Sequence, residues 1–222
     1  MRLLIIGAGG HGRVVADVAK AANIDVFAFV DDNPKADTVK DIPVYDSIET
    51  AIADNHYEEP HFIIALGDNH VRAREYSRAV AAGLKPASVI HPSAVLSESA
   101  YVGPGSFIAA QATVNADASI GENVIVNTAA IVEHDCVVGS HAFVAPAAVL
   151  CGNVYVGAYT FVSSNATLVP NVRVGEHALI AAGAVVTKNH PDKVRLMGVP
   201  ARDIPLSENA EVTGLIPDFI SH

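Results

Sequence analysis

One hexapeptide of this chain of 222 residues gathers side chains that can move a proton. His134 stands between Glu133 and Asp135 in the segment Val132-Glu-His-Asp-Cys-Val137. In an ordinary strand the two acids would point away from the histidine. Where the backbone bends at a corner between two strands, either acid can hydrogen-bond the imidazole. Such a partner fixes the tautomer and raises the basicity of the ring, as a general base near neutral pH requires. His134 is therefore a candidate general base, the alternative being a solvated corner histidine with two surface acids.

A glycine further along the chain is a candidate for binding a carbonyl oxygen. Gly152, in Cys151-Gly-Asn153, follows His134 by eighteen residues. If eighteen residues form one coil, Gly152 stacks one strand spacing from the histidine, and its N–H can serve an oxyanion site. Asn127 is a weaker candidate for orienting the same site, because an asparagine ladder or a plain corner residue explains it better from the sequence alone.

A third group of candidates lies in the glycine-rich turn Gly7-Ala-Gly-Gly-His-Gly12, which follows the apolar run from Leu3 to Ile6. A glycine turn between a strand and a helix presents N–H groups and the positive helix end to an anion. Gly9 and Gly10 are therefore candidate substrate-binding residues. His11 either contacts a phosphate or sugar hydroxyl or is an unremarkable residue of the turn.

The rest of the N-terminal region predicts a small α/β layer. Strands are expected at 3–6, 26–30, 42–45 and 62–66, and helices at 14–22, 47–54 and 69–82. The second strand ends at Asp31-Asp32, roughly where a ribose-binding carboxylate follows the glycine turn in dinucleotide folds. Gly67, after the fourth strand, joins the substrate-binding candidates. About 85 residues is too short for a complete dinucleotide fold, which needs two such halves, so we expect a half-sized Rossmann-like domain.

The frame for His134 is a repeat of six residues. Every sixth residue from Ile90 to Val186 is aliphatic, and four residues after each comes a small or compact one. Neither the helical period of 3.6 nor the strand period of two explains this pattern. Hexapeptide periodicity is typical of a parallel β-helix, whose stacked coils bury one continuous core. We predict a triangular prism with eighteen residues per coil, in which Cys136 takes an inward small position.

Glycines spaced by eighteen residues support this coil length. They are predicted to stack along one corner, where a residue without Cβ can adopt positive φ; they are Gly103, Gly121, Gly139, Gly157 and Gly175. Four other histidines of the repeat are predicted to be prism-surface residues: His91, His141, His177 and His190. A zinc site of the γ-carbonic-anhydrase kind wants a close histidine pair, and none accompanies His134, so no metal is expected.

These patterns divide the chain into three parts. An α/β domain is predicted over residues 1–86 and a β-helix over 87–206, with Gly198-Val-Pro-Ala-Arg202 closing the helix. Residues 207–222 show no firm pattern and form either a mobile tail or an arm on a neighbouring subunit.

Composition excludes several functions. The net charge of -10 argues against nucleic acid as the main partner, although a local basic patch for an anionic cofactor stays possible. Cys136 and Cys151 form no disulfide framework, and no window of about 18 apolar residues indicates a membrane span. A cytoplasmic location is therefore expected.

The chain resembles a known family over nearly its whole length. The resemblance rests on the glycine turn, Asp31-Asp32, Asn127-Thr128, the residues from Glu133 to Cys136, Cys151-Gly152-Asn153 and Gly198-Val-Pro-Ala201. The chain looks like the sugar acyltransferases that combine a nucleotide-sugar-binding half-Rossmann domain with a left-handed β-helix. Among these it is most similar to the UDP-4-amino-sugar N-acetyltransferases of bacillosamine biosynthesis, which serve protein glycosylation, with the sialic acid O-acetyltransferases as relatives.

The resemblance implies a homotrimer that holds acetyl-CoA, as co-substrate, between adjacent prisms. It implies that His134 is the catalytic base, that Asp135 stands where relatives carry an acidic partner, and that Gly152 contacts the acetyl carbonyl. His11, Asp31 and Asp32 match the positions that meet the nucleotide sugar.

The resemblance is less complete around the cofactor. The resemblance places Phe143 at a cofactor position where relatives carry a histidine, so that contact does not carry over. Ala182 and Gly183, in the later turn, are expected along the pantetheine arm.

Three other functions remain open from the sequence. A sugar O-acetyltransferase would use the same His134. A nucleotide-sugar-binding scaffold without chemistry would be indifferent to that residue. An NAD-linked oxidoreductase, suggested by the glycine turn alone, lacks the second half of its fold.

Overall fold

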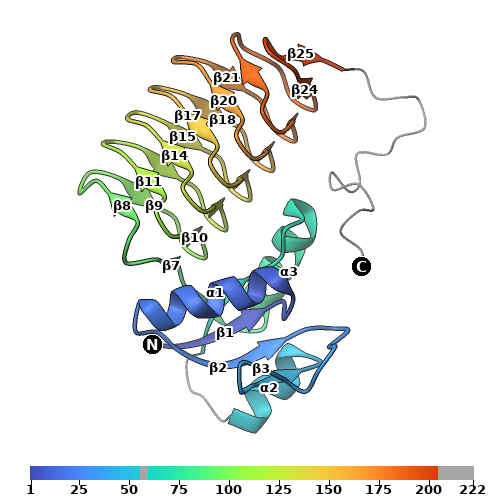
Figure 1. Cartoon of the computed structure of the whole chain (residues 1–222). Helices are drawn as coiled ribbons and strands as arrows, with labels where there is room; N and C mark the ends of the chain where they lie inside the picture. Colours follow the sequence, from blue (N-terminus) through green and yellow to red (C-terminus); the bar gives the residue numbers. More distant parts are fainter. Residues whose placement is uncertain (56–59, 205–222) are drawn as a thin grey trace.

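The computed structural model describes residues 1–55 and 60–204, and it places an α/β layer at one end of a tall coil of short strands (Figure 1). Three helices flank the sheet of this layer: α1 (Gly10–Ala21), α2 (Ile48–Asn55) and α3 (Asn69–Ala81). The strand order is β3-β4-β2-β1-β5-β6, parallel except between β3 and β4. The strands are β1 (Arg2–Ile6), β2 (Asp25–Val30), β3 (Thr38–Val39), β4 (Ile42–Tyr45), β5 (His61–Ile64) and β6 (Lys85–Pro86).

The remaining strands form the three faces of the predicted prism, and each face is a parallel sheet. The first face contains β7 (Val89–Ile90), β10 (Phe107–Ile108), β13 (Ile125–Val126), β16 (Phe143–Val144), β19 (Phe161–Val162), β22 (Leu179–Ile180) and β24 (Arg195–Met197), with β25 (Arg202–Asp203) antiparallel at its end. The second face contains β8 (Val95–Leu96), β11 (Thr113–Val114), β14 (Ile131–Val132), β17 (Val149–Leu150), β20 (Thr167–Leu168) and β23 (Val185–Val186). The third face contains β9 (Tyr101–Val102), β12 (Ser119–Ile120), β15 (Val137–Val138), β18 (Tyr155–Val156) and β21 (Arg173–Val174).

The repeat of six residues is confirmed by the register of these strands. From β7 to β20, each strand pairs with the strand eighteen residues later, as Ile131 does with Val149. The aliphatic is the second residue of its strand and faces the interior, so that Val132 and Leu150, for example, are fully buried. Cys136 is likewise buried among these side chains, as its inward small position predicts.

The expected role of the stacked glycines was wrong. None of the five has positive φ; a Cβ on Gly139 would instead lie 2.5 Å from the backbone nitrogen of Ala158 in the next coil. These glycines are therefore required by the close approach of neighbouring coils. Positive φ falls on the third residue after each aliphatic, at every sixth position from Gly105 to Gly183, and includes Asp135 and His141.

The prism also continues beyond the point where the repeat ends in sequence. Val194 and Leu196 are buried in its core, and β24 pairs with β22. Leu196 follows Ile180 by sixteen residues, because this coil is shorter than the others. The period of six is lost there, which is why the sequence pattern stopped too early.

The α/β layer packs on the first face of the prism. The outward residues of that face are buried with helix α1 in one hydrophobic cluster, which includes Val15, Ala19, Phe107, Ile125 and Phe143. The corresponding outward residues of the other faces are more exposed, and Val95 on the second face is 62% exposed. Apolar outward residues on one face therefore select where the layer docks.

Helix α3 clamps the corner between the third and first faces, called here the third corner. The fully buried guanidinium of Arg72 donates to Leu66 O (3.2 Å) and Gly67 O (3.4 Å) in the layer and to Asn123 O (3.1 Å), His141 O (2.7 Å) and Ala142 O (3.1 Å) in the prism. Burial lowers the pKa of Arg72 to about 9, so the side chain stays charged at neutral pH. Carbonyl oxygens of both parts accept hydrogen bonds from this buried charged group, so Arg72 joins the α/β layer to the prism.

Two of the histidines predicted to lie on the prism surface are instead covered at this corner. His177 stacks on His70 of α3, with ring centroids 5.2 Å apart, and also on Tyr159 (4.8 Å). His141 packs against Tyr159 and has a side chain only 13% exposed. The surface prediction was wrong for these residues because the repeat does not indicate which corner a helix will cover.

Candidate active site

The candidate base lies at the second corner of the prism, between the second and third faces. Strand β14 ends at Val132, and the chain then turns outward, so that the side chains of His134 and Asp135 are 61% and 56% exposed. Nδ1 of His134 is 2.7 Å from Oδ2 of Asp135. Asp135 has a positive φ. Because its carboxylate contacts Nδ1, Nε2 is the ring nitrogen of His134 that stays available to a substrate.

The two acids beside His134 have different partners. Glu133 accepts a hydrogen bond from Nδ2 of Asn115 (2.8 Å), one coil away. Asp135 is the acid that contacts the imidazole, and this resolves the choice that the sequence left open. The pKa of His134 is raised above its ordinary value, first by the hydrogen bond with Asp135 and further by the charges of both acids. The ring is therefore a stronger base than a free imidazole.

Gly152 lies directly against the imidazole. A Cβ on this glycine would be 2.6 Å from both Cε1 and Nε2 of His134, so the ring occupies the space that any larger residue would need. Among the described residues, no backbone carbonyl accepts a hydrogen bond from the N–H of Gly152. The corner therefore combines an available ring nitrogen and a neighbouring N–H donor, the two groups that acyl transfer uses.

Other residues predicted to share this site lie elsewhere on the prism. Asn127, Ala182 and Gly183 follow strands of the first face and lie at the first corner, between the first and second faces. Phe143 belongs to the first face, where it stacks on Phe161 and is buried beneath the α/β layer. One copy of the chain thus leaves the expected catalytic and cofactor residues at separate edges of the prism.

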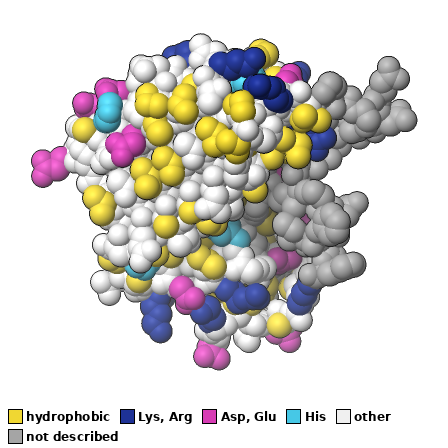
Figure 2. All heavy atoms as spheres, turned by 45° about the horizontal axis from the view of Figure 1, so that its top comes forward, with side chains coloured by type: hydrophobic (Ala, Val, Ile, Leu, Met, Phe, Trp, Pro, Cys, Tyr) yellow, Lys and Arg dark blue, Asp and Glu magenta, His cyan; other side chains and the backbone are white. Residues whose placement is uncertain are grey.

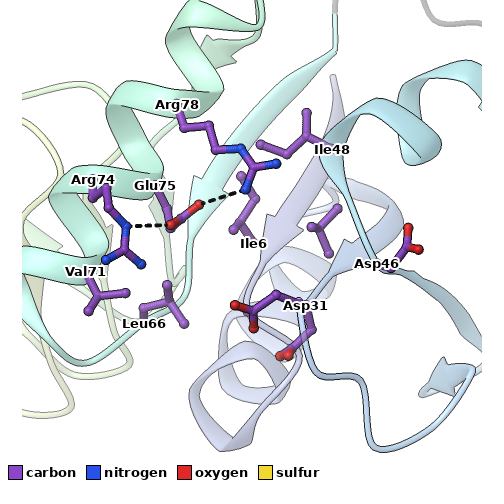
Figure 3. A pocket seen from close by; sticks show the side chains of 12 residues that line it. Ile6, Asp31, Asp46, Ile48, Leu66, Val71, Arg74, Glu75 and Arg78 are labelled. Atoms are coloured by element: carbon purple, nitrogen blue, oxygen red, sulfur yellow. Dashed lines mark hydrogen bonds and ion pairs between the residues drawn. The ribbon is translucent and has the colours of Figure 1, made fainter.

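A second candidate region is a pocket in the α/β layer, at the carboxyl ends of β1 and β2 (Figure 3). Its apolar lining includes Ile6, Val30 and Leu66, and both predicted aspartates, Asp31 and Asp32, also line it. This edge of a parallel sheet is where α/β proteins bind ligands. Oδ2 of Asp31 accepts from Ala8 N (2.9 Å), so this carboxylate also holds the glycine turn in place.

The remaining substrate-binding candidates, Gly9, Gly10, His11 and Gly67, are not among the residues that line this pocket. From the glycine turn only Gly7 lines it; Gly9 and Gly10 lie at the start of α1, and the carbonyl of Gly67 accepts a hydrogen bond from Arg72. The ring of His11 packs edge-on against Phe107, with centroids 5.2 Å apart, and its buried Nε2 has no hydrogen-bond partner among the described residues. Burial, together with the nearby positive charge of Arg72, lowers the pKa of His11 to about 4. His11 is turned toward the prism because the first face supplies an aromatic surface there.

Several pocket residues were missed by the sequence analysis. Arg74, Glu75 and Arg78 project from α3, and Asp46 follows β4. Arg74 and Arg78 are four residues apart on a helix, which places them on one face, but surface charges at this spacing are too common to mark a site.

Two structural findings bear on the class of site. Within residues 1–55 and 60–204, no group of three or more His, Cys, Asp or Glu side chains is arranged to hold a metal ion. In the same residues no helix has both the length and the apolar character of a membrane span.

Comparison with known proteins agrees with this architecture. The PglD N-terminal domain family matches residues 2–79, and the bacterial transferase hexapeptide family (six repeats) matches residues 153–188. A histidine variant of perosamine N-acetyltransferase from Caulobacter crescentus, solved with CoA and GDP-perosamine, is 35% identical; the match covers 92% of this chain and 97% of that one, with a TM-score of 0.88. The acetyltransferase domain of PglB from Neisseria gonorrhoeae, solved with acetyl coenzyme A, is also 35% identical, over 91% of this chain and 98% of that one, with a TM-score of 0.85.

A β-helix of hexapeptide repeats joined to a nucleotide-binding α/β layer defines a class of acyltransferase. The chain belongs to the hexapeptide-repeat sugar acyltransferase family. Within that family it is an acetyl-CoA-dependent sugar N-acetyltransferase.

Proposed function

We propose that the protein transfers an acetyl group from acetyl-CoA to the amino group of a UDP-linked 4-amino-sugar, with His134 as the general base. The observation that carries the proposal is the corner itself, where Asp135 holds Nδ1 and Nε2 lies beside Gly152. The solved relatives support the class of reaction, since one is an N-acetyltransferase bound to CoA and a nucleotide sugar. That relative carries a GDP-sugar, so the UDP assignment is a matter for experiment.

The proposed reaction is a direct transfer. The neutral amine attacks the carbonyl carbon of the thioester, a C–N bond forms, and the C–S bond breaks. Nε2 of His134 takes the proton that the amine loses, and that proton then passes to the departing thiolate of CoA. The N–H of Gly152 stabilises the oxyanion while the carbonyl carbon is tetrahedral. No covalent enzyme intermediate is required.

The positions of the Lys and Arg residues along the prism support one orientation of bound acetyl-CoA. No Lys or Arg occurs between residues 86 and 172, whereas Arg173, Lys188, Lys193, Arg195 and Arg202 follow. Figure 2 shows dark blue side chains at one end of the prism and none over its middle. Lys188 follows His134 by three coils of eighteen residues, or roughly 14 Å along the edge. We place the phosphates of CoA at this basic end and the thioester at His134.

We further propose that the active enzyme is a homotrimer with its sites between adjacent prisms. The outward residues of the second face are all β-branched, from Val95 to Val185, and form a half-exposed strip suited to packing against another prism. The candidates at the first corner, Asn127, Ala182 and Gly183, reach the second corner only if a second copy supplies one of the two edges. The site is therefore incomplete in a single chain.

The cellular role that we propose follows from the reaction. Acetylation of an activated amino-sugar belongs to the synthesis of glycan precursors, as in bacillosamine formation, and is expected in the cytoplasm. A sugar O-acetyltransferase would use the same base on a hydroxyl group.

The test is a thiol-release assay with acetyl-CoA and matched UDP- and GDP-linked amino and hydroxy sugars, with product identified by mass spectrometry. We expect amide formation with a UDP-4-amino-sugar. Transfer to a hydroxyl group alone would establish the O-acetyltransferase alternative, and faster transfer to the GDP-linked amine would overturn the choice of nucleotide. Absence of transfer to every acceptor would leave a nucleotide-sugar-binding scaffold.

A further inference from the structure

A pair of arginines bridged by one carboxylate stands at the pocket of the α/β layer. Arg74 and Arg78 both line the pocket from α3, and Glu75 lies between them (Figure 3). Nε of Arg74 is 3.0 Å from Oε1 of Glu75, and a terminal nitrogen of Arg78 is 3.7 Å from Oε2 of the same carboxylate. Arg78 also lies 3.4 Å from Glu49.

The exposure of these side chains does not fit a purely stabilising role. Arg74 and Arg78 are 69% and 53% exposed, whereas Glu75 is only 17% exposed. Ion pairs to such exposed arginines contribute little to folding, because water screens them and the long side chains lose entropy. The arrangement instead keeps two guanidinium groups available at the mouth of a cavity, around a carboxylate that a stronger anion can displace.

The rest of the pocket indicates which anion. One wall is apolar, with Ile6, Val30, Ile48 and Leu66, and suits the flat face of a nucleobase. Asp46 lies at the opposite side of the pocket from the arginines and suits hydroxyl or N–H donors (Figure 3). A ligand that needs an apolar slot, donors at one side and negative charge at the other is a nucleoside diphosphate.

We infer that Arg74 and Arg78 bind the diphosphate of the nucleotide sugar, and that Glu75 holds the two arginines in place until the diphosphate displaces it. This inference rests on the proposed function, since it concerns the same donor–acceptor reaction. Arginine forms bidentate hydrogen bonds with phosphate oxygens, which a lysine does not reproduce. The two arginines thereby set affinity for the diphosphate, which every nucleotide sugar shares, and leave the choice of base to the remaining lining.

The test is equilibrium binding of UDP and of GDP to the full chain by isothermal titration calorimetry. We expect Arg74→Met and Arg78→Met each to weaken both ligands by about 10- to 100-fold, the range for hydrogen bonds to charged groups. Both variants should also show a weaker dependence of affinity on salt. Arg2→Met, which removes an exposed arginine from the opposite end of β1, is the matched control and should bind as the wild type does.

Two further measurements separate diphosphate binding from a general loss of the pocket. Uridine binding, followed by ligand-observed NMR, should be unchanged in both arginine variants, because uridine has no phosphate. Glu75→Gln should tighten UDP binding by about two- to fivefold, since it removes the competing carboxylate. Unchanged UDP affinity in both arginine variants, or an equal loss for uridine, would overturn the inference, and weaker UDP binding in Glu75→Gln would overturn the role of Glu75.

The outcome is separable from that of the proposed function. If the arginine variants bind UDP normally while the wild type acetylates an amino-sugar, only the diphosphate assignment fails. If the wild type binds neither UDP nor GDP, the assignment of a nucleotide sugar fails as well.

Discussion

Two corners of one coil of the prism carry histidines, and the chain covers only one of them. His134 at the second corner is 61% exposed, whereas His141 at the third corner is 13% exposed. The hydrogen bond with Asp135 raises the pKa of His134, and burial lowers the pKa of His141. The same repeat thus produces a basic, accessible imidazole at one corner and a neutral, packed one at the other. What differs is the helix that lies on the third corner.

The largest expected effect separates the two histidines by activity. His134→Ala should lower turnover by at least about 100-fold, since it removes the general base, while the assembly stays intact. His141→Asn, which tolerates the positive φ of that position, should keep turnover near that of the wild type. Thiol-release kinetics together with analytical ultracentrifugation provide the check. Near-full activity in His134→Ala would refute the assignment.

The second prediction concerns the clamp at the third corner. Arg72→Met should reduce the free energy of unfolding by about 3–5 kcal/mol, because several buried carbonyl oxygens lose their donor together. Arg2→Met, at an exposed ion pair with Asp25, should change it by less than about 1 kcal/mol. Chemical denaturation followed by circular dichroism measures both. Equal effects would show that Arg72 does not hold the layer to the prism.

The third prediction compares Gly152 at the second corner with Gly139 at the third corner. Gly152→Ala should lower turnover by about 10- to 100-fold with little loss of stability, because the three atoms nearest its Cβ all belong to the movable ring of His134. Gly139→Ala should instead lower the melting temperature, since its Cβ meets the backbone of the next coil. Kinetics and thermal unfolding of both variants test the distinction. It fails if Gly139→Ala is as stable as the wild type.

The fourth prediction uses pH to test Asp135. The imidazole must be neutral to act as a base, so the rate falls as pH drops below the raised pKa of His134. Asp135→Asn removes the negative charge that favours the imidazolium, so the acid limb of kcat/KM should move to lower pH. A pH profile with an unmoved limb would assign the raised pKa to another group.

The smallest expected effect is on stability in acid. The pKa of His11 is lowered to about 4 in the folded chain, and an unfolded histidine titrates near 6.5, so the unfolded state binds the proton first. Stability should therefore be full above about pH 6.5 and be lost as pH falls from there toward 4. His11→Met should show a shallower loss in urea titrations at pH 7 and pH 5. The same slope in both proteins would exclude His11 as a source.

The local order of the chain could be predicted well. The period of six fixes which side of each strand faces the core, because a parallel β-helix has one inward aliphatic per hexapeptide, as Val132 and Leu150 illustrate. The spacing of His134 and Gly152 by one coil predicted their contact for the same reason. The glycines of the third corner were located correctly, but for the wrong reason. Glycine is required there because neighbouring coils approach too closely for a Cβ, and a sequence period does not report that distance.

The positions of side chains between distant segments could not be predicted. The turn suggested a phosphate contact for His11, yet Phe107, which receives its ring, is almost a hundred residues away. Arg74, Glu75 and Arg78 looked like an ordinary charged helix until β1 and β2 formed the other side of the pocket. The alternating outward residues of the first face, such as Phe107 and Phe143, were the one available signal for the docking of the layer.

By itself, the sequence determined the α/β layer, the coil of eighteen residues and the pairing of His134 with Gly152, since all of these follow from local periodicity and backbone spacing. Only the tertiary structure decided which acid holds the imidazole, which corner is covered, and which helix faces the nucleotide pocket. These depend on the docking of the layer against one face of the prism, where contacts between residues far apart in the chain outweigh local preference.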